Sequence, residues 1–241
     1  MDNRGLAMEA AKILTEKDGA FAAVRKIGEI KITDVRLDKN AAGLIGRSPG
    51  RYITLEGQPY CSGMTALLRR GLQQLLPPSG RLFVVGLGNP DITQDSLGAM
   101  AVRRITVRKS RKYRIFAMET DVAANTGISS AKLVRGAARE IRADCVIAID
   151  ALACNNPRYI GGTVQLSDSG IIPGSGTGTE GMGLNRKTLG IPIAAVGVPT
   201  VTALSSVTGN KEDSSFLITS ADIALRTEAW ADAIGRALDM L

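Results

Sequence analysis

The amino-acid sequence predicts an α/β fold, with a twisted, mostly parallel sheet and helices on both faces. Two continuous apolar runs, RLFVVGLG at 81–88 and DCVIAIDALA at 144–153, are typical of strands buried on both sides of a parallel sheet. Helical patterns alternate with such strands along the chain, as parallel crossover connections require. No linker divides the sequence, so we expect a single domain over residues 1–241.

The first third of the chain predicts two helices and two strands. The apolar spacing of residues 6–17 indicates a first helix, and the alternating segment EIKITDVRL at 29–37 is typical of a half-buried strand. A Ser-Pro-Gly turn then leads into a short strand at Tyr52–Leu55. A second helix at 63–76 ends at two prolines and a glycine, which do not continue a helix.

The rest of the chain alternates strands with helices around the two buried runs. One helix begins near Asp95, with Thr93 or Asp95 as its N-cap, and a Ser-capped helix follows at 129–143. A last amphipathic helix carries Trp230 on its apolar face. The other predicted strands lie at 114–119, 162–167, 192–199 and 215–219.

The composition excludes several classes of catalytic site. The chain has no histidine, so a Ser-His-Asp triad, a Cys-His pair and a His-ligated zinc site are impossible. Acid–base chemistry near neutral pH must come from carboxylates, Lys, Tyr or Cys with a shifted pKa, and carboxylates are the commonest of these. Cys61, Cys145 and Cys154 lack metal-type spacing, which predicts reduced thiols in a cytosolic protein.

Neither a membrane nor a nucleic acid is an expected partner. The sequence lacks an apolar run of about 18 residues, and its acidic first residues do not form a secretory signal. Much of the net charge of +7 lies in RRITVRKSRKYR at 103–114. Only Tyr113 is aromatic there, so a solvated connector is favoured, although a surface for an acidic partner stays possible.

Two predicted strands carry acids where they end. Asp91 and Asp95 follow VVGLG, and Asp150 lies at the tip of VIAID. Because ligands of open α/β sheets bind beyond the carboxyl ends of the strands, Asp95 and Asp150 would face one another if the strands are neighbours. Two close carboxylates share a proton, activate water and protonate a leaving amine. The alternative is that both aspartates only cap a helix and a turn.

A dinucleotide-binding loop is the less favoured interpretation of these glycines. GLGNPD has Asp91 where the third glycine of a Gly-x-Gly-x-x-Gly motif belongs. A formal match, GTGTEG, places Gly176, Gly178 and Gly181 in register, but no strand directly precedes it. A mobile loop over the site is favoured there, with phosphate binding and an inert linker as alternatives.

Other nucleophiles or bases are weaker candidates. Cys154 lies four residues past Asp150, but without histidine its thiolate would need Lys or Arg to lower its pKa. Most such cysteines are buried packing residues. Lys187 would be a base only if desolvated, and a surface lysine is the default.

Several segments together resemble the germination protease family of spore-forming bacteria, endopeptidases that degrade small acid-soluble spore proteins. The resemblance runs in order along almost the whole chain. It is carried by the segments NRGLAMEA, SPGRYITLE, GLGNPDITQDSLGAMAV, VIAIDALA, QLSDSGIIPGSGTG, KTLGIPIAAVGVPTV and FLITSADI.

The resemblance implies an atypical aspartic endopeptidase with a three-layer α/β sandwich similar to that of the hydrogenase maturation proteases. It implies Asp95 and Asp150 as the catalytic pair, and it leaves open which of them is the acid. Since the metal of the maturation proteases is partly held by histidine, we expect no metal and no cofactor here. Tentative substrate-binding residues in the same cleft are Asp91, Glu119, Asp168, Gly174 and Gly176, with Ser167 beside them.

The family also implies partners and a location. We expect small acid-soluble spore proteins as substrates, a homo-oligomer, and a cytoplasmic location in the spore or forespore core. Two alternatives remain open: a non-catalytic member that binds a partner through its basic face, and a maturation-type peptidase with a bound metal. Loss of function on changing Asp95 or Asp150 to Asn, and metal analysis, would separate them.

The sequence departs from the family pattern in ways that suggest a short, divergent member. Only three residues precede RGLAMEA, although the family is typically made as zymogens with a pro-segment, so we expect activity from birth or another form of control. The segment after GVPTV is shorter than in the family. Ile172 stands at a family histidine and Ala203 at a family acid, which predicts a shifted pH dependence or substrate fit.

Overall fold

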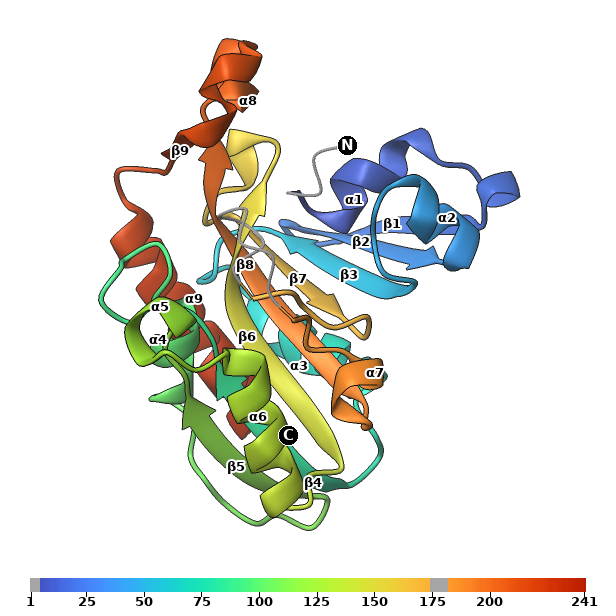
Figure 1. Cartoon of the computed structure of the whole chain (residues 1–241). Coiled ribbons are helices and arrows are strands. Elements are labelled where there is room, and N and C mark those ends of the chain that lie inside the picture. The colour runs from blue at the N-terminus through green and yellow to red at the C-terminus, as the bar shows by residue number, and fades with distance from the viewer. Residues whose placement is uncertain (1–4, 174–181) are drawn as a thin grey trace.

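A mixed sheet, with nine strands in the described residues, forms the centre of the protein (Figure 1). The computed structural model describes residues 5–173 and 182–241. The strands follow the order β1-β2-β3-β7-β8-β6-β4-β5, and β9 pairs with β8. Their bounds are β1 Ala20–Ile27, β2 Ile30–Leu37, β3 Gly50–Glu56, β4 Gly80–Gly86, β5 Tyr113–Glu119, β6 Cys145–Cys154, β7 Thr163–Ser167, β8 Ile193–Ala203 and β9 Leu217–Ile218.

Helices connect and cover these strands. The long ones are α3, α6 and α9, and their apolar residues face the sheet. The helices in the described residues are α1 Ala7–Ala10, α2 Lys39–Leu44, α3 Met64–Leu75, α4 Leu97–Val102, α5 Ala123–Thr126, α6 Ser130–Glu140, α7 Arg186–Leu189, α8 Ser205–Thr208 and α9 Ile223–Asp239. Short 3₁₀ turns lie at Ala11–Ile13, Glu16–Asp18, Pro157–Tyr159 and Lys211–Ser215.

The α/β class is confirmed, but the expectation of a mostly parallel sheet is wrong. Parallel pairing joins β5, β4, β6 and β8. The pairs β1–β2, β2–β3, β3–β7, β7–β8 and β8–β9 are antiparallel. Connection length explains the first of these pairs: β1 and β2 are joined by a two-residue hairpin turn, which only antiparallel strands allow.

Helices lie on both faces of the sheet, as expected. Residues of α3, α4 and α9 pack on one face, around the fully buried Trp230. On the other face, α1 and α2 cover β2 and β3, while α6 and α7 cover β4, β6 and β8. In Figure 1, α6 lies in front of the strands and α3 behind them. The centre of that second face, between the two helical groups, is where a cavity opens.

The N-terminal elements differ most from the sequence-based expectation. The predicted helix at 6–17 is α1 followed by two 3₁₀ turns. Strand β1 was not predicted, because nearly all of its residues are exposed and their apolar and polar types do not alternate. Gly28 has φ +58° in the turn that pairs β1 with β2, a conformation that glycine adopts at little cost. The predicted strand at 215–219 is reduced to β9.

Three arginines of the basic stretch 103–114 pair with acids of the chain. Its paired arginines are Arg103 with Glu119 at 2.8 Å, Arg104 with Asp232, and Arg108 with Asp239 at 3.0 Å. These acids belong to β5 and α9. The pairs support the interpretation of this stretch as a connector. None of the helices in the described part of the chain has the length and apolar character that a membrane span requires.

Candidate active site

The carboxyl ends of β4 and β6 lie side by side, which was the condition for a carboxylate pair. Gly86 is in parallel register with Ile149, and the backbone N–H of Leu87 donates to the carbonyl of Ile149 over 2.8 Å. The segment that carries Asp95 therefore begins directly beside the residue that precedes Asp150.

Glycines allow this close approach. A Cβ on Gly98, at the start of α4, would lie 2.3 Å from the carbonyl oxygen of Leu87 and 2.7 Å from that of Ile149. Gly88 has φ +101°, and a Cβ there would lie 2.2 Å from the carbonyl oxygen of Asp95. The glycines of GLG…LG therefore allow backbone segments to pack closely around Asp95. A nucleotide-binding loop would instead leave space for a pyrophosphate.

Asp95 is half-buried and held by the turn that precedes it. The backbone N–H of Asn89 donates to Asp95 Oδ2 over 2.6 Å. The hydroxyl of Thr200, from β8, donates to the carbonyl of Gln94 over 2.7 Å and fixes the same segment. Burial raises the pKa of Asp95, the Asn89 N–H lowers it, and the charge of Asp121 raises it further.

Asp150 is buried, with 5% of its surface exposed. Its Oδ1 accepts the backbone N–H of Ala151 over 3.0 Å. Burial raises the pKa of Asp150 well above the ordinary range, and the charge of Asp95 is the next cause. Asp95 therefore lies close enough to Asp150 for its charge to disfavour ionisation of Asp150.

Asp121 is a third acid at this edge that the sequence analysis missed. It lies two residues beyond β5, whose Glu119 is in register with Gly86. Its carboxylate accepts both the backbone N–H of Val122 at 2.6 Å and the side-chain amide of Asn125 at 3.1 Å. Asp121 follows the predicted strand at 114–119, just as Asp95 and Asp150 lie at the ends of theirs, so its position beyond a strand end was a signal in the sequence.

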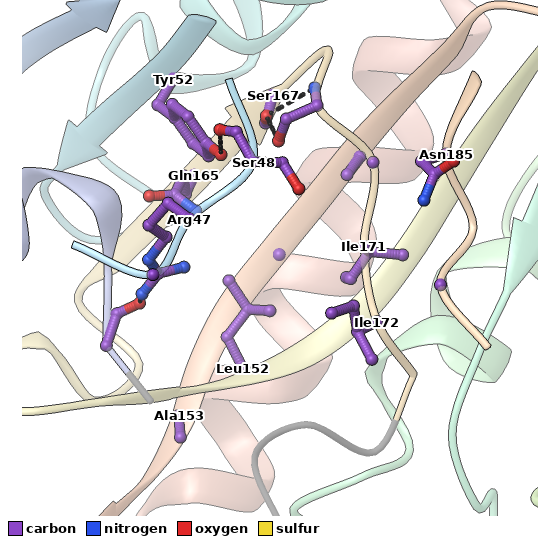
Figure 2. Close-up of a pocket in the computed structure, with 17 residues that line it drawn as sticks. Arg47, Ser48, Tyr52, Leu152, Ala153, Gln165, Ser167, Ile171, Ile172 and Asn185 are labelled. Atoms are coloured by element: carbon purple, nitrogen blue, oxygen red, sulfur yellow. Dashed lines mark hydrogen bonds between the residues drawn. The ribbon is translucent and has the colours of Figure 1, made fainter. Parts of the chain in front are cut away.

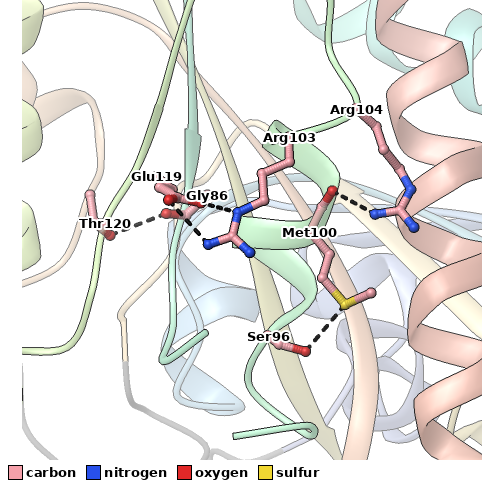
Figure 3. Close-up of polar contacts among 7 residues, drawn as sticks. All are labelled: Gly86, Ser96, Met100, Arg103, Arg104, Glu119 and Thr120. Atoms are coloured by element: carbon pink, nitrogen blue, oxygen red, sulfur yellow. Dashed lines mark hydrogen bonds and ion pairs between the residues drawn. The ribbon is translucent and has the colours of Figure 1, made fainter. Parts of the chain in front are cut away.

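The other predicted site residues have local partners. The carboxylate of Glu119 accepts from Arg103 at 2.8 and 3.2 Å (Figure 3). Asp168 Oδ1 accepts the backbone N–H of Arg51 over 2.7 Å. Asp91 is exposed beside the Asn89 turn. Gly174 and Gly176, like Gly178 and Gly181 of GTGTEG, lie outside the described residues.

A cavity of about 330 Å³ opens on the sheet face that carries Asp150 (Figure 2). Leu152 and Gly197 form part of its floor, and Gly197 is in register with Asp150. Ser167 lines this cavity, whereas neither Asp95 nor Asp150 is among its lining residues. Ile172 lines it too, so the position of the family histidine faces this space. Arg47, which also lines it, carried no recognisable sequence signal.

The alternative nucleophile and metal sites gain little support. Cys154 is buried, and burial raises the pKa of its thiol to about 12, which keeps it protonated at neutral pH. Lys187 is exposed. In the ranges 5–173 and 182–241, no group of three or more His, Cys, Asp or Glu side chains is arranged to hold a metal ion.

The fold and this site define an α/β protein with two neighbouring aspartates, one buried and one half-buried, at the carboxyl edge of parallel strands. A model of the family described as germination protease matches residues 3–219. The chain belongs to the germination protease family, which confirms the resemblance seen in the sequence.

Similar proteins are longer than this chain. The germination protease of Oceanobacillus iheyensis is 32% identical over 245 residues, which cover 86% of this chain and 66% of the relative. That of Geobacillus sp. is 31% identical over 244 residues, covering 86% and 65%. The chain thus spans slightly less than two thirds of these relatives.

A solved structure is also similar. The [NiFe] hydrogenase maturation protease HycI from Thermococcus kodakarensis has a TM-score of 0.44 and 18% sequence identity, and the match covers 69% of this chain and 97% of that one.

Proposed function

We propose that this protein is an aspartic-type endopeptidase that hydrolyses peptide bonds with Asp95 and Asp150. The observation that carries the proposal is the buried Asp150 beside Asp95 at adjoining strand ends, in a chain of the germination protease family. Both carboxyl groups have raised pKa values, which favours a pair that holds one shared proton, and this is the state that acid–base hydrolysis needs.

In the proposed mechanism the two aspartates have different roles. The Asn89 N–H stabilises the charged form of Asp95, so Asp95 is the base that takes a proton from water while the water oxygen attacks the peptide carbonyl carbon. Asp150 is more deeply buried and keeps the proton. It gives this proton to the amine nitrogen as the C–N bond breaks. Transfer of the proton from Asp95 to Asp150 restores the pair.

The proposed substrates are small acid-soluble spore proteins, cleaved during germination. The family to which this chain belongs supports this choice. The open cavity on the sheet face that carries Asp150 supports it too, because such a cavity accepts an extended, unfolded segment more readily than a folded domain. The net charge of +7 favours acidic substrates. Asp91, Glu119, Asp168, Gly174 and Gly176 stay predictions as substrate-binding residues.

Further properties belong to the same proposal. The protein would act in the cytoplasm of the spore or forespore core, as a homo-oligomer. Its activity would be controlled through a zymogen stage or by another means. It would use no metal and no cofactor, and it would contact neither a membrane nor nucleic acid directly.

Incubation with purified small acid-soluble spore proteins, followed by mass spectrometry, tests the proposal. We expect discrete endoproteolytic products that persist in the presence of a chelator. Metal analysis of the same preparation should find no stoichiometric metal. Cleavage that requires an added metal would support a maturation-type peptidase instead, and partner binding without cleavage would support a non-catalytic family member.

A further inference from the structure

The regular pairing of β8 with β6 is interrupted just beyond the candidate catalytic pair. The two strands lie side by side and run parallel (Figure 1). Pro199 is in register with Leu152, but Ala153, the next residue of β6, is in register with Val201. Thr200 is therefore an extra residue in β8. A bulge of this kind changes the direction of a side chain and is common next to active sites.

The side chain of Thr200 is polar at a position where valine would serve packing equally well. Val196 and Val198, which precede it at the same spacing in β8, belong to the apolar core beneath α3, α4 and α9. Thr200 is also buried, with 1% of its surface exposed. A buried hydroxyl is costly unless it has a hydrogen-bond partner. The Thr200 hydroxyl has such a partner, because it donates to the carbonyl oxygen of Gln94 over 2.7 Å.

This hydrogen bond connects the Asp95 segment, residues 89–95, to the sheet. The other contacts of the segment are local: the backbone N–H of Asp95 donates within its own turn over 2.8 Å, and that of Asn89 donates to the Asp95 carboxylate over 2.6 Å. Among the hydrogen bonds of the described residues, the Thr200 bond alone joins the Asp95 segment to another strand or helix. Local bonds keep the shape of the segment, but they do not fix its place relative to Asp150.

The backbone is thus held on both sides of the turn. Before the segment, the backbone N–H of Leu87 donates to the carbonyl of Ile149 in β6 over 2.8 Å. At its end, the Thr200 hydroxyl in β8 holds Gln94, the residue directly before the candidate base. Thr200 is itself held, because the hydroxyl of Thr219 donates to its carbonyl over 2.6 Å. Two neighbouring strands therefore each contribute one of these hydrogen bonds.

We propose that Thr200 is a positioning residue for the peptidase reaction, and that its hydroxyl holds Gln94 so that the Asp95 carboxylate stays in place beside Asp150. This inference rests on the proposed peptidase function and adds a residue to it. Thr200 acts through the backbone before Asp95 and has no part in the proton transfers. A displacement of about 1 Å at a reacting group can lower a rate about a hundredfold, so one such hydrogen bond is enough to matter.

The kinetic test compares changes of two buried threonines in β8. Thr200→Val keeps the size of the side chain and removes the hydroxyl, so kcat on small acid-soluble spore proteins should fall about ten- to a hundredfold with KM nearly unchanged. Thr202→Val is the matched control, because Thr202 is also buried and donates to the carbonyl of Cys154 over 2.7 Å. Thr202→Val should keep the wild-type kcat. Equal losses of kcat in the two variants, or wild-type kcat in Thr200→Val, would overturn the inference.

Thr200→Ser separates the effect of the hydroxyl from that of packing. Serine keeps the O–H donor and loses only the methyl group, so this variant should retain most of the wild-type kcat. If Thr200→Ser lost as much kcat as Thr200→Val, the methyl group and not the hydrogen bond would be responsible, and the inference would be wrong.

Amide hydrogen exchange, followed by NMR, tests the position of Asp95 without any cleavage. The Asn89 N–H donates to the Asp95 carboxylate, so its protection from exchange reports whether this carboxylate stays in place. The Leu87 N–H is the internal reference, since global unfolding exposes both amides. In Thr200→Val, exchange at Asn89 relative to Leu87 should be about tenfold faster than in the wild type, as expected when one hydrogen bond is lost. An unchanged ratio would contradict the inference.

The two measurements distinguish this inference from the proposed function. If the wild type cleaves nothing, but Thr200→Val still accelerates exchange at Asn89, then Thr200 positions Asp95 and the peptidase proposal fails. If the wild type cleaves its substrate, and Thr200→Val matches it in both kcat and exchange, then the peptidase proposal stands and the positioning role of Thr200 is wrong.

Discussion

The backbone N–H of Leu87 donates to the carbonyl of Ile149 over 2.8 Å, one residue beyond the last paired residue of β4. This hydrogen bond joins the turn that leads to Asp95 with the residue before Asp150. It therefore fixes the two candidate catalytic segments relative to one another through backbone atoms alone.

Gly98→Ala should separate these segments. The new Cβ would lie 2.3 and 2.4 Å from backbone atoms of Leu87, which have little freedom to move. We expect a loss of about 3 kcal/mol in unfolding free energy, together with loss of peptidase activity. Gly136→Ala in α6 is the control, since a Cβ there meets nothing within 4 Å. Gly136→Ala should raise the free energy of unfolding, measured in urea, by up to about 1 kcal/mol. Similar effects of Gly98→Ala and Gly136→Ala would contradict the prediction that close backbone packing requires Gly98.

The pH dependence of kcat/KM should be bell-shaped and displaced upward. Activity is lost as pH falls through the pKa of Asp95, which then becomes protonated, and as pH rises through that of Asp150, which then loses its proton. Both pKa values are raised, so the optimum should lie clearly above the ordinary aspartate value of about 3.9. An optimum at or below that value would contradict the assignment.

Asp121→Asn tests the third acid. Removing its negative charge should lower the pKa of Asp95, because the Asp121 charge raises it. The acid limb of the kcat/KM profile should therefore move to lower pH, while the alkaline limb stays nearly unchanged. Steady-state kinetics over the full pH range would measure this shift. A movement of the acid limb to higher pH would show that Asp121 does not act on Asp95 in this way.

Asp150→Asn should stabilise the folded protein at neutral and alkaline pH. A folded-state pKa above the unfolded value means that the native state binds the proton more tightly, so wild-type stability falls as pH rises through the raised pKa. The uncharged Asn avoids this loss, and we expect a gain of about 1–3 kcal/mol at high pH that disappears at low pH. Urea unfolding followed by fluorescence of Trp230, the only tryptophan, measures it. An equal change in the free energy of unfolding at low and high pH would contradict this prediction.

The Arg103–Glu119 pair should contribute little to stability. Both side chains are largely exposed, so water screens their attraction despite the 2.8 Å contact. A double-mutant cycle with Arg103→Gln and Glu119→Gln should give a coupling energy below about 1 kcal/mol. If Glu119→Gln alone also reduces kcat/KM strongly, the prediction that Glu119 binds substrate gains support.

The buried parallel strands and their acids could be predicted from the sequence, because burial on both faces leaves a continuous apolar run. β4 and β6 both show such runs, and a polar residue at the end of each run is conspicuous. The N-terminal antiparallel strands could not all be predicted in this way. β1 is an exposed edge strand, so its sequence lacks the alternation of apolar and polar residues that would indicate which side faces the core.

The cavity could not be predicted from the sequence either. Arg47 and Gln165 come from segments more than a hundred residues apart, and only the pairing of β3 with β7 brings those segments together. A half-buried arginine in a Gly-Arg-Ser-Pro turn has no local signature, since an exposed one has the same neighbours.

The most direct test of the central claim is kcat/KM on small acid-soluble spore proteins for the wild type, Asp95→Asn and Asp150→Asn, with folding checked by circular dichroism. The account predicts that each variant folds and loses activity by about a thousandfold or more. It also predicts that the double variant is hardly worse than either single one, because the two aspartates act as a unit. Substantial cleavage by a folded single variant would contradict the two-carboxylate mechanism.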